Sequence, residues 1–139
     1  MRLVLDTNVV ASALLWRGVP QMLLQAGRER RVSLFTSIQL LAELTDILAR
    51  LKFEKKLAAS GLTIGQIVDR YAELAALVQP AVIAPTVLDD PDDDQVLACA
   101  VAARANLIVS GDRRHLLPMS TFEGMPIVLP AEALRIITA

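Results

Sequence analysis

The chain has 139 residues, of which 54% are apolar and only 4% aromatic, and its 14 basic and 15 acidic residues give a formal net charge of −1. This length suits a single domain over residues 1–139, and Cys99, the only cysteine, excludes an internal disulfide. The balanced charge carries no overall electrostatic footprint of a nucleic-acid binder. Because no apolar run suits a signal peptide or a membrane span, we expect a cytoplasmic protein with no membrane partner.

The first half of the chain mixes short apolar runs with helical periodicity. The run from Leu3 to Leu5 predicts a buried strand that ends at Asp6. Apolar residues at helical spacing follow Thr36, and Gln39 completes a capping box with it, so we expect a long helix there. In chain order the pattern predicts a strand at 3–5, helices at 9–16 and 20–25, a strand at 32–35, and helices at 37–51 and 62–78, with Asn8, Pro20 and Gly27 at helix ends.

The second half of the chain continues the alternation. Prolines on both sides of residues 81–84 allow at most a short edge strand there. A helix at 94–104, strands at 107–109 and 126–129, and a last helix at 131–137 complete the predicted elements. Strands that alternate with helices indicate an α/β fold whose parallel sheet is covered on both faces.

Three carboxylates are predicted to meet at one edge of this sheet. Asp6 ends the first strand, Asp112 follows the strand at 107–109, and Asp94 opens the helix before that strand. Ligand sites in parallel α/β sheets gather beyond the carboxyl ends of the strands, and a helix that folds back onto its strand begins at that end. We therefore expect Asp6, Asp94 and Asp112 to project from the same edge.

Other polar residues leave two interpretations open. Glu43 lies in the second turn of its helix, where it could face a cleft or simply be solvated. Within the acidic run 89–94, Asp90 and Asp92 are expected to favour the helix dipole, whereas Asp93 is ambiguous. His115, the only histidine, suits a structural role better than a catalytic one, and the arginines after Asp112 suit a solvated turn or phosphate contacts equally well.

Converging carboxylates point to a metal-dependent reaction on phosphate esters. They repel one another and raise their own pKa values unless a cation binds among them. Hard oxygen ligands without histidine or cysteine suit Mg²⁺ or Mn²⁺ better than zinc, and these ions activate water and polarise a phosphoryl group for in-line hydrolysis. Separate basic clusters at 28–31, 50–56 and 113–114 could contact the phosphates.

The motifs resemble those of the PIN domain, and the resemblance covers essentially the whole chain. It rests on four segments in matching order: Leu5-Asp6-Thr7-Asn8-Val9, Ala42-Glu43-Leu44, the run from Asp94 to Ala100, and Val109-Ser110-Gly111-Asp112. It implies a three-layer α/β/α sandwich with a central parallel sheet of four to five strands, and Mg²⁺- or Mn²⁺-dependent cleavage of single-stranded RNA. By motif position the catalytic, metal-binding acids would be Asp6, Glu43, Asp94 and Asp112, and further metal or substrate contacts would come from Asp93, Thr7, Asn8, Ser110 and Arg113.

The variant of these motifs is similar to VapC-like toxins of prokaryotic type II toxin–antitoxin systems. That likeness implies a homodimer and a small antitoxin protein as partner. The chain departs from many relatives after the last motif aspartate, where Arg113, Arg114 and His115 replace a further acidic or amide residue. This departure removes a fifth metal contact from the expected set.

Other protein classes fit less well. A haloacid-dehalogenase-like phosphatase needs a second aspartate where Asn8 stands, and both that class and response-regulator receivers need a late lysine, whereas none follows Lys56. A housekeeping RNA-processing nuclease and a non-catalytic PIN-like module that binds RNA or a partner protein both remain open as alternatives.

Overall fold

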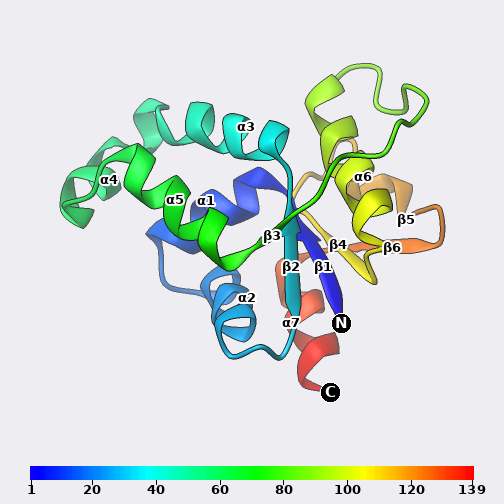
Figure 1. Cartoon of the computed structure of the whole chain (residues 1–139), viewed down its shortest axis with the longest axis horizontal. Coiled ribbons are helices and arrows are strands. Elements are labelled where there is room, and N and C mark those ends of the chain that lie inside the picture. Colours follow the sequence, from blue (N-terminus) through cyan, green and yellow to red (C-terminus); the bar gives the residue numbers. More distant parts are fainter.

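The computed structural model describes the whole chain, Met1–Ala139. Figure 1 shows a central sheet with helices on both sides and with the two chain ends close together. None of its helices has the length and apolar character that crossing a membrane requires. The elements in order are β1 (Arg2–Leu5), α1 (Thr7–Leu15), α2 (Val19–Arg28), β2 (Ser33–Thr36), α3 (Ile38–Leu48), the 3-10 helix η1 (Leu51–Phe53), α4 (Glu54–Ser60), α5 (Ile64–Leu74), β3 (Ala76–Leu77), α6 (Pro91–Ala103), β4 (Leu107–Val109), the 3-10 helix η2 (Leu117–Met119), β5 (Thr121–Phe122), β6 (Met125–Val128) and α7 (Pro130–Thr138).

The sheet has the strand order β3-β2-β1-β4-β6-β5. The first five strands are parallel, and β5 pairs with β6 in an antiparallel hairpin. In the centre of the sheet Leu5 of β1 stands opposite Val109 of β4. The predicted α/β class with a parallel central sheet is confirmed, and this register brings the ends of β1 and β4 side by side.

Side chains of β1 alternate between two apolar clusters, one on each face of the sheet. Leu3 and Leu5 belong to a cluster with residues of α1, α2, α5 and α7, whereas Val4 packs with residues of α6. Figure 1 shows α6 on the opposite side of the sheet from α1, α2 and α5. Helix α3 contributes Leu44 to the first cluster and Leu40 to the second, so its first turns lie across the end of the sheet, beside the ends of β1 and β2.

The predicted edge strand at 81–84 is wrong. Those residues form no strand, and the edge of the sheet is instead β3, where the predicted helix 62–78 has already ended. The amide of Ala81 donates to the carbonyl of Ala98 in α6, 3.1 Å away, and the Val82 side chain is fully exposed. The proline-flanked segment therefore packs along α6, with Ile83 half-buried against the apolar cluster, and does not pair with the sheet.

Several helix ends also differ from the prediction. Ser37, not Thr36, caps α3, and its hydroxyl accepts from the amide of Leu40 at 3.2 Å. The predicted helix 37–51 is too long, because α3 ends at Leu48 and Leu51 already belongs to η1; α4, which follows η1, was not predicted. Gly27 lies inside α2 instead of ending it, because a Cβ atom there would stand 2.8 Å from a Leu34 methyl group and only glycine allows this close approach to β2.

Candidate active site

The ends of β1 and β4 hold two of the predicted carboxylates together. Asp6 follows β1, and its amide donates to the carbonyl of Val109 at 2.8 Å. The buried Ser110 hydroxyl donates to Asp6 Oδ2 at 2.8 Å and accepts from the amide of Asp112 at 3.0 Å. One serine therefore fixes both aspartates, and the expected convergence of Asp6 and Asp112 is found.

The third carboxylate at this edge comes from Asp93, in the first turn of α6. Asp93 is only 8% exposed, and its Oδ2 atom has no hydrogen-bond partner. His115 Nδ1 lies 3.4 Å from that atom and 3.5 Å from Asp112 Oδ2, although the geometry does not make a hydrogen bond to Asp93. Asp90, the cap of α6, approaches from the same turn, and one ligand atom each from Asp90, Asp93 and His115 lies within 4.8 Å of the others.

Asp94 does not take part in this convergence, contrary to expectation. Its carboxylate accepts from the amides of Val87 at 2.8 Å and Thr86 at 3.2 Å, and it faces a separate groove along residues 79–85. Successive residues of a helix point about 100° apart, and Asp94 is turned away from the side on which Asp93 meets the cleft. Asp94 therefore holds the loop before α6.

The apolar residues of α6 do not by themselves distinguish Asp93 from Asp94. Residues 96–100 are all buried, so apolar side chains follow both aspartates at helical spacing. The difference between the two aspartates lies in where the helix begins and in how it packs on the sheet. Because this helix begins at Pro91 and not at Asp94, the predicted start placed the wrong aspartate at the sheet edge.

Glu43 reaches the cluster through a threonine. The Thr7 hydroxyl donates to Glu43 Oε1 at 2.7 Å and lies 3.5 Å from Asp6 Oδ1. Burial raises the pKa of Glu43 to about 7, with further increases from the charges of Asp6, Asp92 and Asp90 and an opposing decrease from the Thr7 hydrogen bond. The structure thus brings Glu43 next to Asp6, as the motif position predicted.

The remaining pKa shifts show how strained the cluster is without a cation. Burial, then Asp112, Asp90 and Asp6, raises the pKa of Asp93 to about 8. Burial also raises the pKa of Asp6, against the Ser110 hydrogen bond. Asp112 differs, because hydrogen bonds from the amides of Arg114 and His115 outweigh its own burial and lower its pKa. The group therefore combines one stabilised carboxylate with two that resist ionisation.

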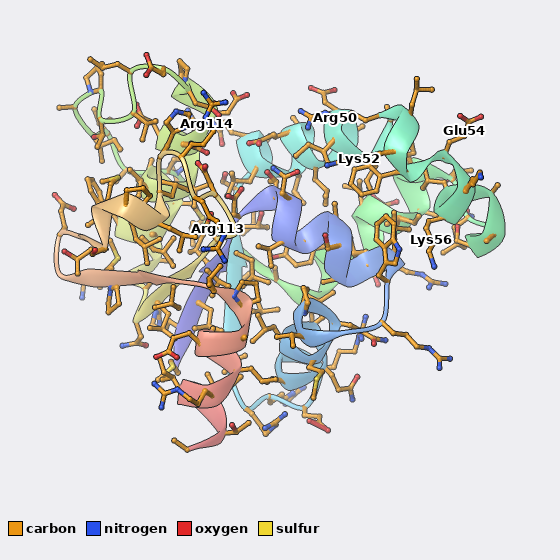
Figure 2. All side chains as sticks on the ribbon, turned by 180° about the vertical axis from the view of Figure 1, so that it is seen from behind. Arg50, Lys52, Glu54, Lys56, Arg113 and Arg114 are labelled. Carbon is orange, nitrogen blue, oxygen red and sulfur yellow. The ribbon has the colours of Figure 1, made fainter.

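These side chains line a cleft of about 570 Å³. Figure 2 shows Arg114 on the loop after β4 and, on the other side of the start of α1, Arg50 and Lys52. Among the further contacts expected, Asn8 lines the cleft, Thr7 and Ser110 hydrogen-bond to its acids, and Arg113 does not line it although the next residue does. The cleft is lined by Asp6, Asn8, Val9, Ser12, Pro20, Arg50, Lys52, Asp90, Asp93, Gly111, Asp112, Arg114, His115 and Pro130.

The prediction missed the second role of Asp90, and it named the basic cluster 50–56 as possible phosphate contacts without placing it at the cleft. Asp90 does cap α6, since its Oδ1 accepts from the amide of Asp92 at 3.2 Å, but it also faces the acidic cluster. Arg50 and Lys52 lie just after α3 and reach the cleft only because the chain turns there into η1. No periodic pattern in the sequence indicates that turn.

Comparison with known proteins agrees with this geometry. The family model described as the PIN domain matches residues 2–114. No curated protein matches the chain. A crystal structure of VapBC2 from Rickettsia felis, bound to a DNA fragment from their promoter, is similar with a TM-score of 0.59 and 14% identity over 91% of this chain and 97% of that chain, which shows likeness of fold alone. Because the family model covers most of its length, this chain belongs to the PIN-domain family.

Proposed function

We propose that this chain is a Mg²⁺- or Mn²⁺-dependent ribonuclease that hydrolyses phosphodiester bonds in single-stranded RNA. The observation that carries the proposal is the buried, unpartnered Oδ2 of Asp93, which faces Asp6, Asp112 and His115 at the floor of a cleft with cations at its rim. Buried carboxylates that lack partners are costly, and a bound cation removes that cost. Membership of the PIN-domain family supports the same activity.

The residues present fit a divalent ion. Asp6, Asp93 and Asp112 offer the hard oxygen ligands that Mg²⁺ and Mn²⁺ prefer, and the imidazole of His115 with Asp90 would favour Mn²⁺ over Mg²⁺ at a neighbouring position. When bound, such an ion would polarise the phosphoryl group and make a coordinated water easier to deprotonate. Glu43 completes the set through Thr7.

The protein's own groups position these acids and hold the substrate. The Ser110 hydroxyl and the amides of Arg114 and His115 fix Asp6 and Asp112 in place. Glu43, with a pKa of about 7 in the absence of a cation, can accept or release a proton near neutral pH at its carboxylate oxygen. Arg50, Lys52 and Arg114 at the rim would bind phosphates on either side of the bond that is cut.

A neighbouring pair of aspartates provides the test. Purified D93N and D94N variants are incubated with a mixed single-stranded RNA pool, with and without Mn²⁺. We expect D93N to lose activity roughly a hundred-fold or more, because it removes a negative ligand, and D94N to retain it, because Asp94 faces another groove. Activity that survives in D93N, or that is lost only in D94N, would contradict the assignment of the site.

We further propose that the chain is the toxin of a type II toxin–antitoxin system and forms a homodimer. Its likeness to a VapBC2 structure, over almost the whole of both chains, supports this role. The exposed apolar side chains of Ile38 and Leu77, which line one groove at the β3 edge, are available for a contact between copies. The toxin role would be supported if expression of the wild type, but not of D93N, arrests growth. A small protein encoded next to this chain should then relieve the arrest. Light scattering, which gives the molar mass in solution, would show whether the chain forms a dimer.

A further inference from the structure

Two aromatic rings and two lysines form a cluster beside the cleft, which we name the aromatic–lysine cluster: Trp16, Lys52, Phe53 and Lys56. The rings of Trp16 and Phe53 are 5.5 Å apart and inclined by 60°. Lys52 Nζ stands 5.1 Å from the centre of the Phe53 ring, and Lys56 Nζ stands 5.6 Å from that of Trp16. Cation–π attraction thus holds two ammonium groups in defined positions.

The cluster continues the cleft along two lines of residues. Asn8 and Ser12 of α1 line the cleft, and Trp16 follows four residues later as the cap just after the helix, with its amide still bonded to the Ser12 carbonyl at 2.9 Å. Lys52 lines the cleft as well, and Lys56 lies four residues beyond it. Figure 2 shows Arg50, Lys52 and Lys56 in succession along α1, with Glu54 away from them at the outer edge.

Phe53 is part of the apolar core, but the stability of the fold gives little reason for the other three side chains of the cluster. Helix α4, which carries Lys56, has no buried residue. Neither lysine forms an ion pair, and the Trp16 side chain is 36% exposed although it is the largest apolar group in the chain. In proteins that bind single-stranded nucleic acids, cations without acidic partners bind the phosphates, and exposed aromatic rings such as this indole stack on the bases.

We propose that the aromatic–lysine cluster binds the RNA strand that leaves the cleft, with Lys52 and Lys56 on successive phosphates and a base stacked on Trp16. This inference rests on the proposed ribonuclease function and adds a binding site outside the acidic floor. Single strands are favoured over duplexes because only unpaired bases can be splayed onto an aromatic side chain. Continuity with the arginine and lysine of the cleft rim favours RNA over an acidic protein segment.

Trp16 is the only tryptophan in the chain, so its fluorescence reports on this site alone. The D93N protein without metal is titrated with a single strand of about ten nucleotides, and binding is followed by Trp16 fluorescence and, separately, by anisotropy of the labelled strand. We expect quenching that saturates at the same concentration as the anisotropy, and much weaker quenching by a duplex of the same sequence. Because the titration needs no cleavage, its failure is distinct from failure of the nuclease proposal.

Lys56 and Lys55 provide a matched pair of charge changes on one exposed helix. Lys55 stacks on no ring and does not line the cleft. We expect K56Q to weaken strand binding about three-fold or more and to lower the slope of log K against log salt by about 0.7, the value for one phosphate contact on a single strand. K55Q is expected to change neither. W16F is expected to weaken binding about five-fold, because base stacking on the larger indole is lost.

Four results would overturn the inference. The first is strand binding, seen by anisotropy, without any change in Trp16 fluorescence, and the second is an equal loss of strand affinity in K55Q and K56Q. The third is duplex binding as tight as single-strand binding, and the fourth is no RNA binding at all. A glutamate-rich peptide that quenches Trp16 and displaces the RNA more effectively than a second strand does would assign the cluster to a protein partner instead.

Discussion

The acidic floor of the cleft and the aromatic–lysine cluster beside it hold their charges in opposite ways. On the floor, burial raises the pKa values of Asp6 and Asp93, and the like charges around them raise these values further. In the cluster, Lys52 and Lys56 are exposed to water and rest on aromatic rings. The first arrangement opposes folding unless a ligand is bound, and the second costs folding almost nothing.

The contrast explains where the rigidity of the molecule is concentrated. Two carboxylates of the floor, Asp6 and Asp112, follow the ends of β1 and β4 in the middle of the sheet, where the Ser110 hydroxyl bonds to both residues, and Asp93 enters from the first turn of α6. The cluster lies on η1, α4 and the end of α1, away from the sheet. A site that must hold an ion needs fixed ligands, whereas a site that binds successive phosphates of a flexible strand tolerates mobile ones.

Ser110→Ala tests the rigidity of the floor, and we expect it to have the largest effect on RNA cleavage among the variants that keep every acidic residue of the floor. Removing this hydroxyl takes a donor from Asp6 and an acceptor from the Asp112 amide, so RNA cleavage should fall about 10- to 100-fold even though no ligand is lost. Ser37→Ala is the control, since Ser37 is equally buried and bonds only to its own helix at Leu40. Similar losses of activity in both variants would show that Ser110 has only a general structural role.

Asp94→Ala should affect stability and leave the floor intact. The variant leaves the amides of Thr86 and Val87 without their acceptor, so we expect a loss of about 1–2 kcal/mol in the free energy of unfolding. Thermal denaturation should show a melting temperature lower by about 3–8 °C. The milder D94N retains one acceptor oxygen and should lose less. If calorimetry shows a reduced Mn²⁺ affinity in D94A, Asp94 would be a metal ligand after all.

The strain in the floor should appear as a pH dependence of the metal-free protein. The pKa of Asp93 is about 8 in the folded chain and 3.8 for an ordinary aspartate, so between these limits the folded state binds more protons than the unfolded state. Stability is then highest at low pH within this window and falls as pH rises toward 8. Glu43, raised from 4.5 to about 7, adds to the fall in the lower part of the window.

We would measure melting temperatures of the wild type and of D93N across this pH window. The difference between the two proteins separates the contribution of Asp93 from that of Glu43. D93N should flatten the decline by a few degrees, because its amide has no charge to desolvate. Mn²⁺ added near the upper limit should restore stability to the wild type and much less to D93N. A wild-type stability that rises with pH in the absence of metal would mean that the acids of the floor are already satisfied.

The sequence predicts the scaffold of this site better than the side chains that enter it. Apolar runs that end in Asp6 and precede Ser110 locate two adjacent strand ends, because a buried parallel strand admits few other patterns. The choice between Asp93 and Asp94 depends on where α6 begins, and an error of three residues in that boundary moves the wrong carboxylate onto the buried face. Helix starts are the least certain part of a periodic pattern because the first turn carries polar caps.

The position of the basic residues at the cleft could not be predicted from the sequence, for a different reason. Arg50 and Lys52 reach it through a break between α3 and η1, at a residue with extended backbone. A continuous helix through residues 37–51 would have fitted the same apolar spacing. Only the packing of Phe53, which is 3% exposed, shows where the chain leaves that helix.

The smallest effect is expected where the cluster contributes to folding. Lys56→Gln should change the free energy of unfolding by less than about 0.5 kcal/mol, since the residue is exposed, forms no ion pair and loses only one contact with Trp16. Lys56→Met retains the aliphatic stem over the indole and should be neutral. Chemical denaturation of both variants measures the difference. A loss above about 1 kcal/mol in K56Q would mean that the lysine braces Trp16 in the fold, and the cations of the cluster would then be as much a structural feature as the carboxylates of the floor.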